Sequence, residues 1–200
     1  QPIHRDLILA LRLSYGQSGG AAPKQSAVGG MENWINDQKE SVGTNPLLVG
    51  ELRNNIKDLF FLDFTAPLRG FRQGKLAGTS HLLFNAELRF PLIRYLYQGT
   101  ITSNFLRNLQ FVGFTDVGTA WNGASGPFSR ENSLNTERFG GSPTPFRVTL
   151  TNFKNPFLIG YGVGVRTMLL GYYVKFDYAW GLENKFVNKP LAYVTLGYDF

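Results

Sequence analysis

Hydrophobic and polar residues alternate in six stretches of the chain, at 6–17, 80–92, 109–121, 159–169, 172–181 and 191–200. In the first stretch, every second residue from Leu7 to Leu13 is a leucine and Tyr15 follows, while Arg12 and Ser14 lie on the opposite face. A period of two is that of a β-strand with one face against an apolar phase. The stretches are close to the 9–11 residues of a tilted membrane strand. The pattern predicts six antiparallel strands.

The second face of these predicted strands is polar and does not resemble a protein core. In 80–92 one face is apolar throughout, and Glu87 and Arg89 lie on the other. In 172–181 the apolar face is mostly aromatic. A soluble β-sandwich strand would also alternate, but soluble domains rarely present aromatic faces of this size to water. The six stretches together favour an all-β fold, a transmembrane antiparallel β-barrel with a wet interior.

Two long segments, 18–79 and 122–156, interrupt the alternation and are rich in turn-forming residues. The first also carries apolar residues, among them Trp34 and Phe64. Because a loop this long and this apolar is unlike a free linker, we expect it to pack inside the barrel or on a partner. We predict one domain over 1–200, with extracellular or lumen-folded loops at 18–79 and 122–156 on the same side.

Composition narrows the range of functions. No window approaches the roughly 18 apolar residues of a transmembrane helix. The chain has no cysteine, and its histidines, His4 and His81, are isolated, so no metal or other cofactor is expected. No Ser/His/Asp set is apparent, so we expect no enzyme activity. The net charge of +6 is dispersed along the chain, so we expect no nucleic-acid partner.

The sequence around Arg69 predicts a specific role for this arginine. Arg69 lies in the first long loop within the sequence Leu-Arg-Gly-Phe at 68–71, and the next two predicted strands each place one carboxylate, Glu87 or Asp116, on the inward face. A guanidinium stays charged and offers carboxylates a planar fork of donors, and Phe114 could lie against its plane. We predict that the loop folds back into the barrel and that these acids hold Arg69. The alternative is a turn arginine on a solvated loop, with both acids as ordinary polar residues of the lumen.

Other inward polar residues are interpreted as ordinary lining of the lumen, namely Arg12, Arg89, Arg166, Lys175 and Asp177. A glycine series at 160, 162 and 164 superficially suggests a nucleotide loop. It lies within a predicted strand and no helix follows it, so space for a packed loop is the better interpretation.

The motifs resemble those of the BamA-type surface-antigen barrels, a superfamily of outer-membrane protein assembly factors. Residues 68–71 are similar to its (V/L)RG(F/Y) motif, 114–118 (Phe-Thr-Asp-Val-Gly) resemble its F-x-D-x-G motif, and Glu87 resembles the acid on the preceding strand. The resemblance implies a loop-lock motif of Arg69, Gly70, Phe71, Glu87, Phe114, Asp116 and Gly118. It also implies a C-terminal assembly signal of Leu196, Tyr198 and Phe200.

The same resemblance implies a sixteen-stranded barrel in the bacterial outer membrane, of which these are the C-terminal six strands. Six strands are too few to close a barrel, so the upstream part of the same polypeptide, or another chain, should complete the wall. The implied function is protein insertion or export. The alternative is a passive barrel that anchors or exports an attached domain. Expected partners are the lipid bilayer of the outer membrane, together with substrate outer-membrane proteins or periplasmic and surface proteins.

Overall fold

The computed structural model describes residues 2–4, 7–35, 62–64, 67–93, 97, 99, 102–140 and 147–197. Its main element is an eight-stranded antiparallel sheet in the order β1-β2-β6-β7-β10-β11, with both β12 and β13 pairing with β11. The strands of this sheet are β1 (Pro2–His4), β2 (Leu7–Gln17), β6 (Ser80–Phe90), β7 (Gln110–Trp121), β10 (Leu158–Leu169), β11 (Tyr172–Glu183), β12 (Phe186–Val187) and β13 (Leu191–Leu196).

The long connections carry smaller elements. A three-stranded sheet in the order β4-β3-β5 is formed by β3 (Gln25–Val28), β4 (Leu62–Phe64) and β5 (Leu76–Gly78). A separate hairpin consists of β8 (Leu134–Gly140) and β9 (Arg147–Phe153). The short helices are α4 (Asn104–Arg107) and α5 (Arg130–Ser133). Within the described residues, no helix has the length and apolar character needed to span a membrane.

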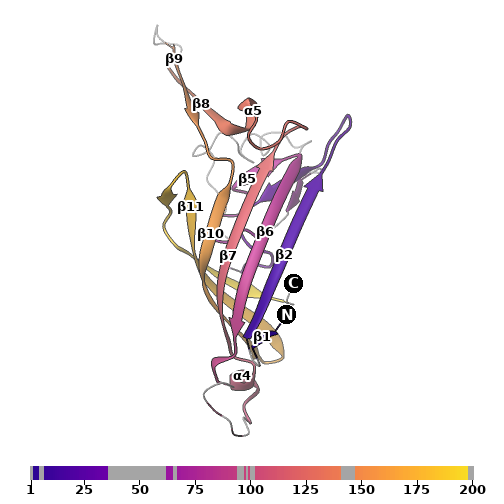
Figure 1. Ribbon diagram of the computed structural model, residues 1–200, viewed down its shortest axis with the longest axis vertical. Helices are drawn as coiled ribbons and strands as arrows, with labels where there is room; N and C mark the ends of the chain where they lie inside the picture. Colours follow the sequence, from indigo (N-terminus) through magenta and orange to yellow (C-terminus); the bar gives the residue numbers. More distant parts are fainter. Residues whose placement is uncertain are drawn as a thin grey trace.

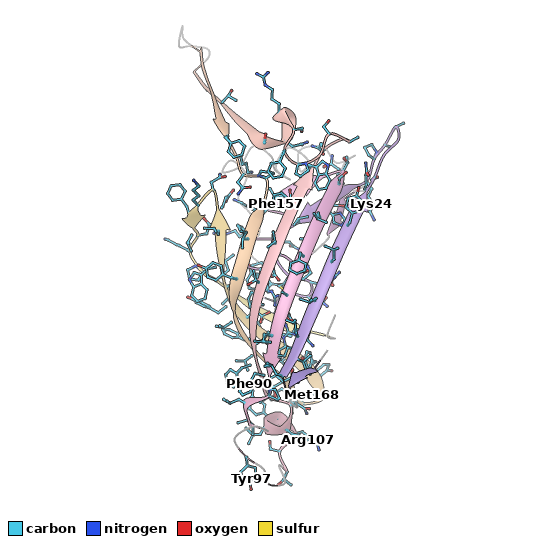
Figure 2. All side chains as sticks on the ribbon, viewed as in Figure 1. Lys24, Phe90, Tyr97, Arg107, Phe157 and Met168 are labelled. Atoms are coloured by element: carbon cyan, nitrogen blue, oxygen red, sulfur yellow. The ribbon has the colours of Figure 1, made fainter. Side chains whose placement is uncertain are left out.

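The long strands lie side by side, and consecutive ones are neighbours in the sheet (Figure 1). The elements of both long connections, among them β5, α5 and the β8–β9 hairpin, lie at one end of the sheet, and α4 lies at the other (Figure 1). Figure 2 shows the same division, with Lys24 and Phe157 at the first end and Phe90 and Met168 toward the second. The labelled elements of the two long connections therefore share one end of the sheet.

The antiparallel all-β class predicted from the alternation is confirmed, and each predicted strand overlaps a strand of the main sheet. The long connections were predicted without strands of their own, and this was wrong for their described parts. There, β3 and β5 pair with each other and place Val28 and Leu76 in the interior. Buried backbone N–H and C=O groups require partners, and strand pairing supplies them.

The two faces of the main sheet have inverted polarity compared with a water-soluble domain. On β2 the side chains of Leu11, Leu13 and Tyr15 are 62%, 71% and 60% exposed. On β7, Asp116 is fully buried while Phe111 points outward with 39% exposure. Charged groups are therefore sequestered and apolar ones displayed, which suits an apolar medium around the sheet.

The interior face is covered by the first long connection. Four of its residues, Val28, Leu68, Phe71 and Leu76, form a buried apolar cluster with Leu83 of β6 and Leu158 of β10. A second cluster joins Met31 and Trp34 of the same connection to Val112, Phe114, Ala179 and Tyr193 of the sheet. The connection is thus packed against the main sheet at two places.

Truncation of Leu83 tests the first cluster. Leu83 is completely buried, and we expect Leu83→Ala to lower the free energy of unfolding by about 2–5 kcal/mol, because the removed methyl groups leave a cavity. The matched control is Leu13→Ala on the outward face, with an expected cost below about 1 kcal/mol. Urea unfolding of the purified protein in one detergent measures both. Equal losses for the two variants would contradict the assignment of the faces.

Candidate functional site

The arginine of the first long connection lies on a turn that is fixed from both sides. Leu68 exchanges two backbone hydrogen bonds with Gly30, each 3.1 Å long. Gly70 has a φ of 88°, in the left-handed region, and a Cβ there would lie 2.5 Å from the backbone oxygen of Trp180. Only glycine satisfies both the backbone conformation and the close approach. The turn therefore sits directly against β11 and directs Arg69 along the interior face.

Asp116 on β7 binds Arg69 through three hydrogen bonds. The guanidinium donates from Nε to Oδ2 at 2.6 Å and from Nη2 to Oδ1 at 2.7 Å, and the Arg69 backbone N–H donates to Oδ2 at 3.1 Å. A bidentate arginine–carboxylate pair fixes orientation as well as charge. The additional backbone bond ties the turn itself, and not only its side chain, to the same strand.

Two further carboxylates complete the shell around the guanidinium. Its Nη1 donates to Glu87 Oε1 on β6 at 2.7 Å and to Asp177 Oδ2 on β11 at 3.3 Å. Arg166 of β10 donates to the same Glu87 oxygen at 2.6 Å, and Arg89 pairs with the other oxygen at 3.0 Å. The site therefore contains three arginines and three carboxylates, so its formal charges balance.

The charged groups at the centre of the site are almost completely buried. Arg69 is 1% exposed, and its guanidinium carbon lies 3.5 Å from the centre of the Phe114 ring, so the aromatic face covers one side of the cation. Burial alone would lower the pKa of Arg69, but the hydrogen bonds and charge of Asp116 raise it above its ordinary value, and Asp177 and Glu87 add to this. Arg69 is therefore a permanent cation.

Tyr193 of β13 attaches the last long strand to the same turn. Its hydroxyl accepts a hydrogen bond from the Gly70 N–H at 2.9 Å and donates one to the Phe71 carbonyl at 2.7 Å. The Tyr193 side chain is fully buried. The turn is thus held by the Arg69 side chain on β6, β7 and β11 and by its backbone on β7 and β13.

Space for the turn comes from a glycine on β10. Gly160 is the register neighbour of Asp116, and a Cβ at Gly160 would collide with the Arg69 carbonyl oxygen. Gly118, at the end of the predicted F-x-D-x-G motif, lies beside Leu68 and Leu83. The backbone of the turn therefore packs directly against the sheet, and both glycines leave the space that this contact needs.

A family model described as the Omp85 superfamily domain matches residues 12–192 of this chain. The chain belongs to the Omp85 superfamily. This superfamily is associated with the outer membrane and with protein insertion or translocation. No curated protein and no solved structure matches the chain.

In this Omp85 superfamily member, the structure brings together all residues of the predicted loop-lock motif. The predicted C-terminal signal is only partly described. Leu196 is 41% exposed at the end of β13, while Tyr198 and Phe200 lie outside the described residues.

The interpretation of the other inward charges as ordinary lining needs correction. Arg89, Arg166 and Asp177 make direct ion pairs with the motif, because the strands that carry them converge on one turn. Arg12 and Lys175 instead line a cavity of about 270 Å³ beside the site, together with Arg69, Glu87 and Arg166. The sequence pattern gave the face of each residue but not the distance between charges on strands far apart in the chain.

Two residues of the site were not singled out from the sequence. Asn85 donates to Asp116 Oδ1 at 2.8 Å and to the Pro67 carbonyl at 2.9 Å. It lies two residues before Glu87 on the same face of the strand, so the alternation already placed it on the inward face. Tyr193 carried a weaker signal, as a polar aromatic on the inward face of the last strand.

Gly160→Ala tests whether the backbone of the turn packs directly on β10. The added methyl must displace the Arg69 backbone, and overpacking of this kind costs about 1–3 kcal/mol. We expect trypsin to cleave after Arg69 in the folded variant but not in the wild type, as read by mass spectrometry. The control is Gly113→Ala on β7, where a Cβ would meet nothing within 4 Å. Equal resistance to trypsin in both variants would contradict the close contact between the turn and Gly160.

Proposed function

We propose that this chain forms part of the wall of an outer-membrane β-barrel of the protein assembly or translocation type, with the first long connection held inside by Arg69. The observation that carries the proposal is the burial of Arg69 among carboxylates of three different strands. The inverted polarity of the sheet supports the membrane setting, and membership of the Omp85 superfamily supports the assembly or translocation role.

The physical role of Arg69 follows from the cost of placing a loop against the wall. Ordering a loop costs roughly 1–2 kcal/mol of backbone entropy for each fixed residue. A buried guanidinium with several charge-assisted hydrogen bonds offsets part of that cost and permits one geometry only. The contacts of Arg69 therefore give the loop one defined position. In that position the turn contacts β6, β7, β11 and β13 together.

This arrangement fits a barrel whose wall must be stable yet able to rearrange during transport. If one member of a buried charge pair moves away, the other is left buried without a counter-charge, which costs about 3–5 kcal/mol in a site without water. The neighbouring cavity of about 270 Å³ has space for water, which would lower this cost. Release of the turn is thus costly but within the reach of a binding partner. A passive barrel that anchors an attached domain would need no such release.

Substitution of Arg69 separates the fold from the function. We expect Arg69→Ala to loosen the connection and to reduce assembly or export of client proteins more than it reduces the amount of folded barrel. Arg69→Lys should restore function only in part, because an ammonium cannot bind two carboxylates in one plane. The measurements are the heat-modifiable folded band of the full-length protein and the level of client proteins in outer-membrane fractions of cells that depend on it.

The control for the change from arginine to lysine is Arg130→Lys, at an exposed position of α5, which should match the wild type. Normal client levels in Arg69→Ala cells with intact folded barrel would favour the passive anchor and contradict the assembly role.

A further inference from the structure

The cavity of about 270 Å³ beside the Arg69 site has a lining with an excess of positive charge. The charged residues of this lining are four cations and two carboxylates, namely Arg12, Arg69, Arg166, Lys175, Glu32 and Glu87. Three of them belong to the Arg69 site, whose formal charges balance. The others, Arg12, Lys175 and Glu32, add one net positive charge. We call this space the basic cavity.

Two of the cations lie side by side on neighbouring strands. Lys175 of β11 is the register partner of Arg166 on β10 and of Thr195 on β13. Directly opposed residues of antiparallel strands have Cβ atoms about 4.5–5.5 Å apart, and like charges in that position repel. Glu87 accepts a hydrogen bond from Arg166 at 2.6 Å, but Arg69 binds the same oxygen. An anion beside Arg166 and Lys175 would therefore relieve their repulsion.

Thr195 supplies a hydrogen-bond donor in the same row. Its side chain is 3% exposed, and within the described part of the chain its buried hydroxyl has no hydrogen-bond partner. A buried hydroxyl that makes no hydrogen bond destabilises the fold that buries it. Because Thr195 lines the basic cavity, an acceptor held there would satisfy this hydroxyl.

Arg12 reaches the basic cavity from β2, which is separated from β10 by β6 and β7 in the sheet. The Arg12 side chain is half-buried and makes no hydrogen bond or ion pair among the residues that the structure describes. A guanidinium stays charged and is a frequent partner of phosphate groups. Donors therefore reach the cavity from separate parts of the main sheet.

We propose that the basic cavity binds a phosphate-type oxyanion through Arg12, Arg166, Lys175 and the Thr195 hydroxyl. A tetrahedral anion suits donors that come from several strands, whereas a planar carboxylate is matched by one guanidinium fork. The cavity volume of about 270 Å³ far exceeds the roughly 10–15 Å³ that one water requires, so it accommodates such an ion with part of its hydration. The inference rests on the packing around Arg69 and is independent of the assembly function.

The bound anion would connect strands that the Arg69 turn also holds. Arg166 shares Glu87 Oε1 with Arg69, and Thr195 lies two residues after Tyr193 on β13. A ligand that binds only the folded protein stabilises it in a concentration-dependent way. Phosphate should therefore stabilise the fold around the turn.

The first test is isothermal titration calorimetry of the full-length protein, folded in a non-ionic detergent, with inorganic phosphate. The ionic strength is kept constant because salt screens charge interactions. We expect saturable binding at one site, and we expect Arg12→Gln to weaken it at least about tenfold, the factor that corresponds to one hydrogen bond between charged groups. The matched control is Arg130→Gln at an exposed position of α5, which should bind phosphate like the wild type.

A pair of threonines separates the effect of the ligand from the effect of packing. Thr195→Val removes a buried hydroxyl without a partner among the described residues, so we expect greater resistance to urea than in the wild type in chloride buffer. In phosphate buffer of the same ionic strength, the variant should lose this advantage, because the wild-type hydroxyl then has an acceptor.

The control for this pair is Thr119→Val on β7. Thr119 is fully buried, its hydroxyl also has no partner within the described part of the chain, and it is not among the residues that line the basic cavity. Thr119→Val should therefore change the resistance to urea by the same amount in both buffers.

Glycerol 3-phosphate distinguishes the two sources of a phosphate group. If it displaces inorganic phosphate at similar concentrations, the basic cavity takes a phosphate monoester, such as a lipid headgroup. If only inorganic phosphate binds, the cavity takes the free ion.

The proposal is overturned if phosphate shows no saturable binding to the folded protein, or if Arg12→Gln and Arg130→Gln bind it equally. It is also overturned if Thr195→Val and Thr119→Val respond identically to the change from chloride to phosphate. Failure of the assembly function is seen in a different measurement, the level of client proteins in outer-membrane fractions, and leaves these outcomes unchanged.

Discussion

Burial of the Arg69 guanidinium is the constraint on which the rest of the site depends. A cation removed from water is tolerated only where carboxylates and hydrogen-bond acceptors replace its hydration. Three strands each supply one carboxylate here, and Arg89 and Arg166 balance the excess negative charge. The positions of β6, β7 and β11 relative to one another are therefore linked through a single side chain of a loop, and Arg166 adds β10 through Glu87.

The guanidinium can reach these acids only because the backbone of its turn lies directly on the sheet. Gly70 supplies the left-handed conformation beside β11, and Gly160 leaves room on β10 for the Arg69 carbonyl. Tyr193 then binds the Gly70 N–H and the Phe71 carbonyl. Electrostatics, steric space and backbone hydrogen bonding thus act on the same few residues, and loss of any one weakens the others.

Much of this was predictable from the sequence because a strand has a strict period of two. The alternation placed Glu87, Phe114 and Asp116 on the inward face, and the structure shows them there around Arg69. The period fixes the face but not the register between strands, so it could not show that Asn85 lies opposite Asp116. Nor could it show that Trp34 bridges Thr195 of β13, since Trp34 lies outside any periodic stretch and reaches β13 only through the tertiary fold.

The central claim is that Arg69 and Asp116 hold the loop against the main sheet as a coupled pair. The most direct measurement is their coupling free energy, from urea unfolding of the full-length protein carrying Arg69→Met, Asp116→Asn or both substitutions. Residues in direct contact within one charge network typically show coupling of about 0.5–3 kcal/mol. We predict that the double variant loses less stability than the sum of the single variants, by about 1–3 kcal/mol. Losses that add to within about 0.5 kcal/mol would contradict the claim.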